Sequence, residues 1–353
     1  MQATDYHAVT DGALEDGIMM VRALTLATVI LLAAAPSLRA ASAKIFLDTD
    51  VCVDAGDLAA LAFLHGLASA GEAEILGITC VTSNPHAPGC VDAINAWYGR
   101  PDVPVGVLKD SGFLSKSDYS EHIAKTWPNR YPDAAGSVPD ATTLFRQVAA
   151  RQPDASVTLV SIGPLRNLRH FLESPADAAS PLDGRSLIAK KVKTLSCMAC
   201  VFQPVKPGGK DNLKVEWNIE QDVASAKAVF ANWPTPVMIS GFEIGWPLLA
   251  DHGIVDHFPQ SPVAYGLKKQ GGGRPAWDQT AVLYAARGLA DYWEAEGPGR
   301  CEIRDDGTNA WTNAPAGRHF FLKAKMDKGP LVQLIDSIQL LAEQKRNRAA
   351  PSR

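Results

Sequence analysis

Short apolar runs and longer stretches of helical character alternate along most of the chain. Residues 44–48 form a short apolar run that ends in an acid, and residues 57–68 follow as an apolar helix with Asp57 as its capping residue. Further runs of strand length lie at residues 74–82, 103–107, 156–163, 191–198 and 236–240, and helical stretches lie at residues 90–99, 141–151, 164–172 and 221–230. This alternation predicts an α/β fold with an open, mostly parallel sheet and helices on both faces.

The segment of residues 111–139 interrupts this alternation. It is rich in Ser, Asp, Tyr and Pro and has no hydrophobic period, which predicts a long loop over one end of the sheet. Loops of this length in compact domains usually carry function. Since residues 44–345 contain no repeat, low-complexity tract or linker, we expect them to form a single domain.

The first 43 residues differ from the rest of the chain. A short basic segment at residues 20–22 precedes the apolar residues 23–35, which are too few to span a bilayer comfortably. Small residues at 41–43, or alternatively around Ala40, provide a cleavage site, so the pattern indicates a signal peptide and an exported protein, periplasmic or secreted. The alternative is a buried N-terminal helix. Residues 1–19 are polar and acidic, which indicates an upstream extension.

The composition is that of a soluble globular protein. The chain of 353 residues is 46% hydrophobic and 20% charged, which is sufficient for a large core. The formal net charge of -4 and the lack of a basic run argue against nucleic acid or an anionic membrane as the main partner. We therefore expect no nucleic-acid binding, and no membrane association once the signal peptide is removed.

Export would permit disulfide bonds. The cysteines are Cys52, Cys80, Cys90, Cys197, Cys200 and Cys301. Cys197 and Cys200 have the spacing of a redox or metal-binding pair, but no second such pair accompanies them. We expect buried thiols or one structural disulfide, whose pairing the sequence does not give.

Polar residues follow the apolar runs at the points where the predicted strands end. These residues are Asp48, Asp50, Asn84, the segment 163–167, Glu216, Asn218 and Asp278. In open α/β sheets the binding site lies outside the carboxyl ends of the strands, so we expect these side chains to converge. Carboxylates and amides with hardly a histidine among them favour a hard, oxygen-ligated cation such as Ca²⁺ or Mg²⁺ over Zn²⁺.

The acidic motif Asp-Thr-Asp-Val-Cys-Val-Asp-Ala-Gly-Asp at residues 48–57 resembles that of the inosine/uridine-preferring nucleoside hydrolase family, with an expanded loop. Matching segments follow in the family's order at residues 77–84, 163–167, 215–218, 234–245 and 277–281. Any single aspartate of this kind is more often a helix cap or a turn former, so the ordered set carries the resemblance. It extends from Lys44 to about Gly317 and implies a Rossmann-like nucleoside hydrolase fold.

The resemblance also implies a mechanism. It assigns Ca²⁺ ligation to Asp50, Asp57, Asp278 and the backbone carbonyl of Arg166, with a water and two ribose hydroxyls completing the site. Asp50 would also be the general base that takes a proton from the Ca²⁺-bound water, which attacks the anomeric carbon. The family's ribose-holding positions match Asn84, Glu216 and Asn218. The implied reaction is hydrolysis of the N-glycosidic bond of nucleosides or related ribosides, a small-molecule salvage activity, and family members are commonly homo-oligomers.

The sequence departs from the family pattern at two positions. Gly56 stands where the family usually has an aspartate that touches a ribose hydroxyl, and Asp54 is the candidate to reach into its place. Trp277 stands where well-studied members have a histidine that protonates the leaving base, and tryptophan cannot donate that proton usefully. Arg274, His86 or aromatic stacking would then activate the leaving group, with Trp277 as a substrate-binding residue.

Two other functions compete with the hydrolase. The departures at Gly56 and Trp277 make a noncatalytic protein that binds Ca²⁺ and sugar a second hypothesis. A third is a phosphatase of the haloacid-dehalogenase type, because Asp48 and Asp50 also resemble its nucleophile motif. Such an enzyme needs a late acidic pair, and residues 305–306 are the candidate, in a Gly/Asn-rich segment without a predicted strand before it.

Overall fold

The centre of the sheet is built from the most apolar part of the chain. The computed structural model describes residues 41–51, 53–132, 137–209 and 211–349. Within it, β1 (Ala43–Thr49) is buried over its last five residues and pairs in parallel with β2 (Ala73–Cys80) and β4 (Val157–Ser161). A parallel strand with neighbours on both sides has helices over both of its faces, so it has to be apolar throughout. This is why the first strand was recognisable in the sequence.

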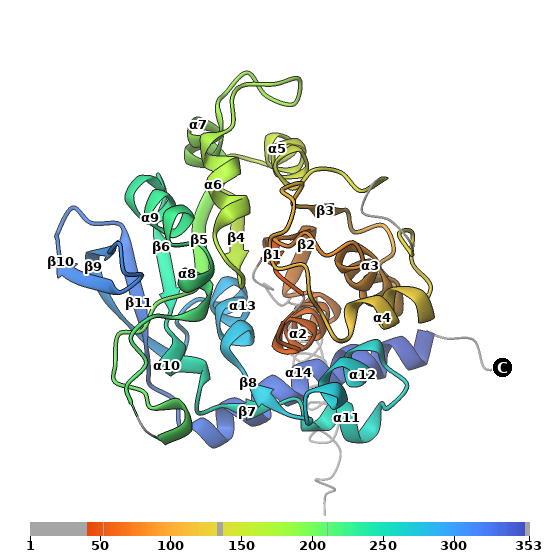
Figure 1. Ribbon diagram of the computed structural model, residues 1–353. Coiled ribbons are helices and arrows are strands. Elements are labelled where there is room, and N and C mark those ends of the chain that lie inside the picture. Colours follow the sequence, from red (N-terminus) through yellow and green to blue (C-terminus); the bar gives the residue numbers. More distant parts are fainter. Residues whose placement is uncertain (1–40, 52, 133–136, 210, 350–353) are drawn as a thin grey trace, which may run out of the picture. The chain divides into compact units, whose positions relative to one another are not determined.

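The main sheet has nine strands in the order β10-β9-β11-β6-β5-β4-β1-β2-β3. The strands not yet named are β3 (Val105–Val107), β5 (Val192–Met198), β6 (Val237–Ser240), β9 (Trp293–Ile303), β10 (Asn309–Asn313) and β11 (His319–Ala324). Pairing is parallel from β3 to β11, whereas β9 and β10 are antiparallel and form one edge (Figure 1). A separate antiparallel pair joins β7 (Leu249–Ala250) to β8 (Arg274–Pro275). The predicted open, mostly parallel sheet is confirmed.

Helices cover both faces of the sheet (Figure 1). One face packs against α2 (Gly56–Ala70), α3 (Ala87–Trp97), α12 (Pro262–Lys269), α13 (Trp277–Arg287) and α14 (Lys328–Ala349). The other packs against α5 (Ala141–Arg151), α6 (Arg166–Glu173), α7 (Gly184–Lys191) and α9 (Val223–Asn232). The remaining helices are α4 (Ser120–Thr126), the 3₁₀ helix η2 (Pro207–Gly209), α8 (Trp217–Gln221), α10 (Phe242–Gly245) and α11 (His252–His257). Two separate apolar cores result, one on each face, as a doubly covered sheet requires.

Several local predictions differ from the structure. Asp57 does not cap α2, because the N-cap residue is Ala55 and Asp57 lies in the first turn. The predicted loop of residues 111–139 contains the short helix α4, whose seven residues are too few to show a period. The helix expected at residues 221–230 is confirmed as α9, which begins two residues later because Asp222 is its N-cap residue, and the short helix α8 before it was not expected.

The acidic pair required by the phosphatase hypothesis lies in a turn at the edge of the sheet. Asp305 and Asp306 connect β9 to β10, so a strand does precede them, contrary to the sequence interpretation. This pair of strands is separated from β1, which carries Asp48 and is followed directly by Asp50, by four strands in the sheet order. Residues from β1 and from this turn therefore cannot form one phosphatase site.

The predicted signal peptide and upstream extension fall on residues 1–40, which lie outside the described residues. Ala43, the last small residue of one predicted cleavage site, already belongs to β1, and its backbone N–H donates to the carbonyl of Glu72 at 2.8 Å. Cleavage near Ala40 would leave this strand complete. In the described part of the chain, no helix is both long and apolar enough to cross a membrane. Residues 42–353 form one compact unit.

Candidate active site

The carboxyl end of β1 and the first turn of α2 bring two aspartates together. Asp50 follows β1 directly, and Asp57 is the second residue of α2; both side chains are buried. Thr49, the last residue of β1, donates its hydroxyl to one carboxylate oxygen of Asp57. β1 is an interior parallel strand, between β4 and β2. Its carboxyl end therefore lies at the edge where binding sites form in such sheets.

A third carboxylate comes from a distant part of the sequence. Asp278 is the second residue of α13, which packs against α2 on the same face of the sheet, and it is also buried. Gly56 lies beside it, since a Cβ built on Gly56 would be 3.1 Å from Oδ2 of Asp278 and equally close to Oδ1 of Asp54. The carboxylate of Asp54 therefore occupies the space into which a side chain at position 56 would extend.

Most of the predicted site residues line one cavity. It has a volume of about 240 Å³ and is lined both by carboxylates and by apolar and aromatic side chains. The residues lining it are Asp50, Val53, Asp54, Asp57, Ile162, Met198, Glu216, Trp217, Asn218, Phe242, Trp277 and Asp278. The tertiary structure thus gathers seven predicted residues from three separate segments into one small space.

Burial and mutual repulsion disfavour the charged forms of the carboxylates in this cavity. Burial, followed by the charge of Asp278, raises the pKa of Asp50 to about 7. The pKa of Asp57 is raised well above its usual range by burial and then by the charge of Asp50, and that of Asp278 by burial and then by the charge of Asp57. Each acid is therefore a cause of the next one's shift, as in other carboxylates that share a site.

A cation from β8 neutralises the fourth acid. The guanidinium of Arg274 forms an ion pair with Asp54, with its Nε 3.1 Å from Oδ1 of the carboxylate. Asp54 also accepts a hydrogen bond of 2.7 Å from the backbone N–H of Gly56. Asp54 therefore reaches the cavity as the sequence suggested, and its carboxylate is paired with Arg274, although its charge still contributes to the raised pKa values of Asp50, Asp57 and Asp278.

Aromatic rings form another part of the cavity lining. Trp277, at the start of α13, lies against Phe242 and Trp246, with ring centroids 5.0 and 5.8 Å away. Its indole Nε1 donates to the backbone carbonyl of Phe242 at 3.1 Å, so the only donor of this side chain is engaged in fixing the ring. Phe242 follows the carboxyl end of β6 by two residues and lines the cavity with Trp277 and Trp217.

Glu216 and Asn218 join the site through the start of α8. The carboxylate of Glu216 caps this helix, accepting from the backbone N–H groups of Asn218 at 2.9 Å and Ile219 at 3.2 Å. Burial nevertheless raises the pKa of Glu216 to about 7. The amide of Asn218 donates to the carbonyl of Met198, at the end of β5, at 3.1 Å. Capping thus holds both side chains rigidly at the cavity wall.

Two predicted residues are not among the described residues that line the cavity. The amide of Asn84 donates to the carbonyl of Ser115 at 3.0 Å and accepts from the backbone N–H of His86 at 2.8 Å, so it holds the segment after β2 to the following loop. The side chain of Arg166 pairs with Asp222 at 2.6 Å. The role predicted for Arg166 concerns its backbone carbonyl, in the first turn of α6, and stays a prediction.

Asp48 lies deeper than the cavity and supports its floor. One of its carboxylate oxygens accepts from the hydroxyl of Thr79 and from the amide of Asn167, which join β1 to β2 and α6. Burial raises the pKa of Asp48 to about 7. His86, a candidate for leaving-group activation, lies 3.9 Å from Glu121 and is not among the cavity-lining residues.

The chain matches the family model described as inosine-uridine preferring nucleoside hydrolase over residues 45–311. This match covers most of the chain and includes every cavity-lining residue. The chain belongs to this nucleoside hydrolase family. No curated protein is similar enough in sequence to match it.

Solved structures of nucleoside hydrolases share its fold. The purine-preferring ribonucleoside hydrolase from Gardnerella vaginalis has a TM-score of 0.64 at 17% identity, covering 85% of this chain and 99% of that one. The inosine-uridine preferring nucleoside hydrolase from Bacillus anthracis has a TM-score of 0.63 at 14% identity, with coverages of 86% and 99%. The type III effector protein XopQ, complexed with adenosine diphosphate ribose, has a TM-score of 0.61 at 12% identity, with coverages of 86% and 95%. At these identities the similarity shows the fold.

The donor chemistry of this family member suits a hard divalent cation. Asp50, Asp57 and Asp278 offer only oxygen atoms, and their mutual repulsion is what a bound cation would relieve. The distances are a separate matter, since among the described residues no group of three or more His, Cys, Asp or Glu side chains is arranged to hold a metal ion. Three buried carboxylates with mutually raised pKa values can be neutralised by protons or by a cation.

Sequence reasoning assigned no role to part of the cavity wall. Phe242, Met198, Ile162 and Val53 line the cavity without having been predicted as site residues. Phe242 and Met198 had a usable signal, since each lies at or just after the carboxyl end of a strand. Apolar residues at strand ends look like continuing core, so only the fold shows that they face the cavity.

Proposed function

We propose that this protein hydrolyses the N-glycosidic bond of nucleosides or related ribosides with the help of Ca²⁺, giving free base and ribose. The observation that carries the proposal is that one cavity is lined both by carboxylates, here called the carboxylate wall, and by aromatic rings, here called the aromatic wall. A ribose presents hydroxyls that carboxylates and amides can bind, whereas a base presents a flat ring that stacks on aromatic side chains. The two walls therefore match the two halves of a nucleoside.

Asp50 is the proposed general base. With a pKa of about 7, its carboxylate can accept a proton from an attacking water at a pH near neutrality. A bound Ca²⁺ would be held by Asp50, Asp57, Asp278 and the backbone carbonyl of Arg166, and would lower the pKa of a water at this wall.

The sugar half of the substrate is held by other groups. Glu216 and Asn218, fixed by the start of α8, would bind the ribose hydroxyls and favour the positive charge that develops on the sugar. Asp54, in the space of the residue that Gly56 lacks, would bind a further hydroxyl while Arg274 limits its charge.

The aromatic wall holds the leaving base. Trp277 cannot give the base a proton, because its Nε1–H already donates to Phe242. Trp277, Phe242 and Trp217 would instead stack on the base and exclude water from it. Such a site favours bases that leave without a strong acid, so we propose that the rate depends on the leaving-group ability of the base. The export signal would place the reaction in the periplasm or outside the cell.

A second candidate is a binding protein that holds a riboside without cleaving it. The leaving base has no evident acid, since Trp277 cannot supply a proton and Arg274, another candidate, pairs with Asp54. The carboxylate and aromatic walls would still bind a ligand in that case. This candidate predicts affinity for a nucleoside without product.

Product analysis separates these functions. Full-length exported protein is incubated with Ca²⁺ and a panel of purine and pyrimidine nucleosides, and separately with nitrophenyl riboside, an O-riboside whose nitrophenolate leaving group needs no proton. We expect free base and reducing sugar from the nucleosides, faster release of nitrophenolate and reducing sugar from nitrophenyl riboside, and loss of all products after treatment with EDTA. Saturable binding without product, including with nitrophenyl riboside, would establish the binding protein. Release of the base in EDTA at an unchanged rate would contradict the role of Ca²⁺.

A further inference from the structure

Two cysteines from opposite ends of the fold meet beneath the edge of the sheet. Sγ of Cys200 lies 3.8 Å from Sγ of Cys301, and both side chains are buried. Cys200 follows β5 by two residues, whereas Cys301 lies in the antiparallel strand β9, between β10 and β11. The two residues are 101 positions apart in the sequence, so nothing but the tertiary fold brings them together.

The backbone around this pair is held in place by other contacts. Asn309, at the start of β10, accepts from the backbone N–H of Val201 at 3.0 Å and donates to the carbonyl of the same residue at 3.1 Å. On the neighbouring strand β11, Nδ1 of His319 accepts a hydrogen bond of 2.9 Å from the backbone N–H of Cys301. The closeness of the two thiols is therefore a consequence of the docked hairpin.

The conformation of Cys200 is a second, independent observation. Its φ of 69° lies in the left-handed region, which favours glycine and is costly for most other residues. A cysteine at such a position is explained if its side chain has a task that glycine could not perform. A covalent bond to Cys301 is such a task.

We propose that Cys200 and Cys301 form a disulfide bond that joins the β9–β10 hairpin to the carboxyl end of β5. The bond forms by thiol–disulfide exchange with a small-molecule or protein disulfide. The thiolate of one cysteine attacks that disulfide and releases one thiol; the second cysteine then attacks the mixed disulfide and releases the other. Two protein thiols are oxidised, and the donor disulfide is reduced to two thiols.

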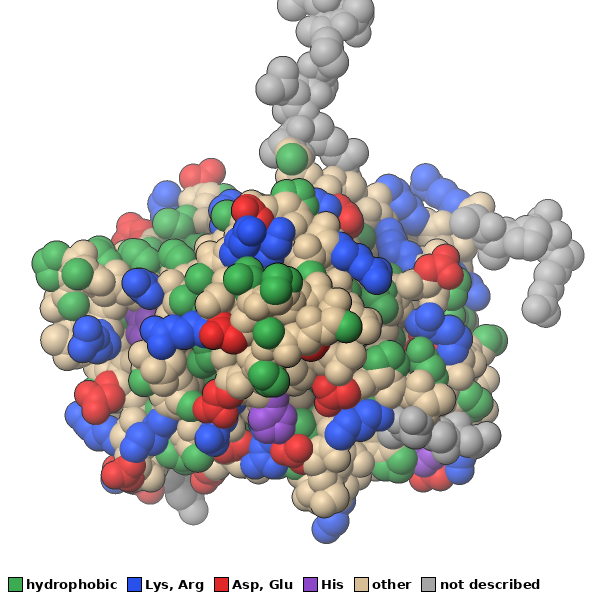
Figure 2. All heavy atoms as spheres, turned by 90° about the horizontal axis from the view of Figure 1, so that it is seen from above, with side chains coloured by type: hydrophobic (Ala, Val, Ile, Leu, Met, Phe, Trp, Pro, Cys, Tyr) green, Lys and Arg blue, Asp and Glu red, His purple; other side chains and the backbone are tan. Residues whose placement is uncertain are grey.

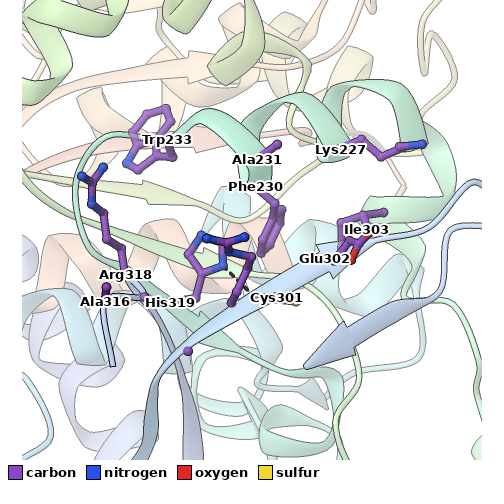
Figure 3. Close-up of a pocket in the computed structure, with 13 residues that line it drawn as sticks. Lys227, Phe230, Ala231, Trp233, Cys301, Glu302, Ile303, Ala316, Arg318 and His319 are labelled. Atoms are coloured by element: carbon purple, nitrogen blue, oxygen red, sulfur yellow. Dashed lines mark hydrogen bonds between the residues drawn. The ribbon is translucent and has the colours of Figure 1, made fainter. Parts of the chain in front are cut away.

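Burial determines when the bond forms. Cys301 belongs to the wall of a cavity of about 610 Å³ between α9, β9 and β11, where Figure 3 shows it beside Phe230 and His319. Its side chain is only 1% exposed, so exchange takes place while the hairpin docks during folding. Once closed, the bond is protected from reductants by the same packing. The proposed export would supply an oxidising compartment for this step.

The bond would support the candidate active site from outside it. The carbonyl of Cys200 accepts from the backbone N–H of Phe242 at 2.9 Å, and its own backbone N–H donates to the carboxylate of Glu216. Both partners line the candidate cavity. Cys200 is thus a positioning residue. Its link to β9 would fix the backbone that Phe242 and Glu216 contact. The disulfide itself does not depend on the proposed function.

Cys197 is the matched control. It is a buried thiol in the same region, on β5, and it forms with Cys200 the sequence pair that resembles a redox motif. The sulfur atom in contact with that of Cys200 belongs to Cys301. Cys197→Ser therefore removes a neighbouring thiol without removing the proposed bond.

Mass mapping tests the pairing. Full-length protein is unfolded, refolded in a mixture of oxidised and reduced glutathione, alkylated under denaturing conditions and digested. We expect a cross-linked peptide that joins Cys200 to Cys301, retained in Cys197→Ser and absent from Cys301→Ser. Alkylation of every thiol in the refolded protein, or a cross-link that contains Cys197, would overturn the proposal. This readout needs neither substrate nor activity.

Thermal unfolding provides the second measurement and covers the case in which a variant folds poorly. Closing a loop of about 100 residues restricts the unfolded chain, so oxidised wild-type protein should unfold roughly 5 to 10 °C above the reduced protein. Cys197→Ser should keep this difference, and Cys301→Ser should lose it. An equal melting temperature for oxidised and reduced wild-type protein would show that no bond closes the loop.

Discussion

Two regions of the molecule bury aspartates with raised pKa values, yet their surroundings differ. Asp50, Asp57 and Asp278 border the candidate cavity, and the charge of one acid is a leading cause of the shift in the next. Asp251, between β7 and α11, is fully buried in the protein, and burial raises its pKa to about 7 as well. A shifted pKa alone therefore does not identify a site.

The neighbours of Asp251 are amides. Its Oδ1 accepts from Nε2 of Gln279 on α13 at 3.0 Å and from Nε2 of Gln339 on α14 at 2.8 Å, while its backbone N–H donates to Asp336. Neutral donors from two helices satisfy Oδ1, whereas Oδ2 has no hydrogen-bond partner among the described residues and the nearby Asp336 contributes to the raised pKa. The cavity acids, in contrast, act mainly on one another, and each has another cavity acid as the leading charge that raises its pKa. The comparison teaches that the partners of a buried acid distinguish a structural tie from a binding site.

The surface adds little to this distinction. On the face shown in Figure 2, the described Lys and Arg side chains are interspersed with Asp and Glu. Such a mixed surface gives no strong field that would steer a highly charged partner. Recognition is then decided inside the cavity, where few groups act at short range.

The sharpest test of the comparison exchanges one acid in each region for its amide. Asp50→Asn should reduce kcat by roughly 10³-fold or more, because it removes the general base and a carboxylate of the cation site. Asp251→Asn, equally buried, should leave kcat within about twofold. Steady-state release of base from the best nucleoside measures both. Equal losses in the two variants would show that the cavity acids have no special role.

The second prediction concerns pH and stability. Asp251 has a folded pKa of about 7 against an ordinary value of 3.8, so the folded state binds its proton more tightly. Its contribution to stability is present below pH 4 and is lost as the pH rises to about 7, by up to about 4 kcal/mol. Asp251→Asn cannot lose this proton, so the free energy of unfolding should fall less between pH 4 and 7. Urea unfolding at several pH values measures this free energy for both proteins. An equal fall between pH 4 and 7 in the wild type and in Asp251→Asn would contradict the raised pKa of Asp251.

The third prediction adds the cation itself. Ca²⁺ at a hundredfold excess over its dissociation constant should raise the melting temperature by roughly 5 °C, because it binds only the folded protein. Asp57→Asn should abolish this shift, whereas Asp251→Asn should keep it. Differential scanning calorimetry in EDTA and in Ca²⁺ measures the effect. A shift that survives in Asp57→Asn would place the cation elsewhere.

The smallest effect is expected at the aromatic wall. Trp277→Phe keeps a ring but removes the Nε1–H donor that fixes it to Phe242, so stacking on the base should weaken. We expect KM to rise roughly 3- to 10-fold with kcat nearly unchanged. Trp233→Phe, in the cavity by Cys301, is the matched control and should leave KM as it is. A loss confined to kcat would instead make Trp277 part of the chemistry.

The sequence by itself determined the fold class and the acids. Strands such as β1 have an apolar centre because they are buried on both faces, so their positions and the polar residues at their ends could be recognised locally. The motif at residues 48–57 and the ordered segments after it also predicted the family correctly. Local patterns were less informative for α4, because its seven residues are too few to show a hydrophobic period. They also misplaced the start of α2, where Asp57 accepts a hydrogen bond from Thr49 instead of capping the helix.

The tertiary structure alone decided which residues share the cavity and which are engaged elsewhere. Asn84 satisfies its amide with the neighbouring loop, Asp54 fills the space beside Gly56, and Arg274 takes up the charge of Asp54. Cys200 and Cys301 meet across 101 residues for the same reason. These contacts depend on the packing of distant segments, and sequence patterns record only the local requirements of each segment.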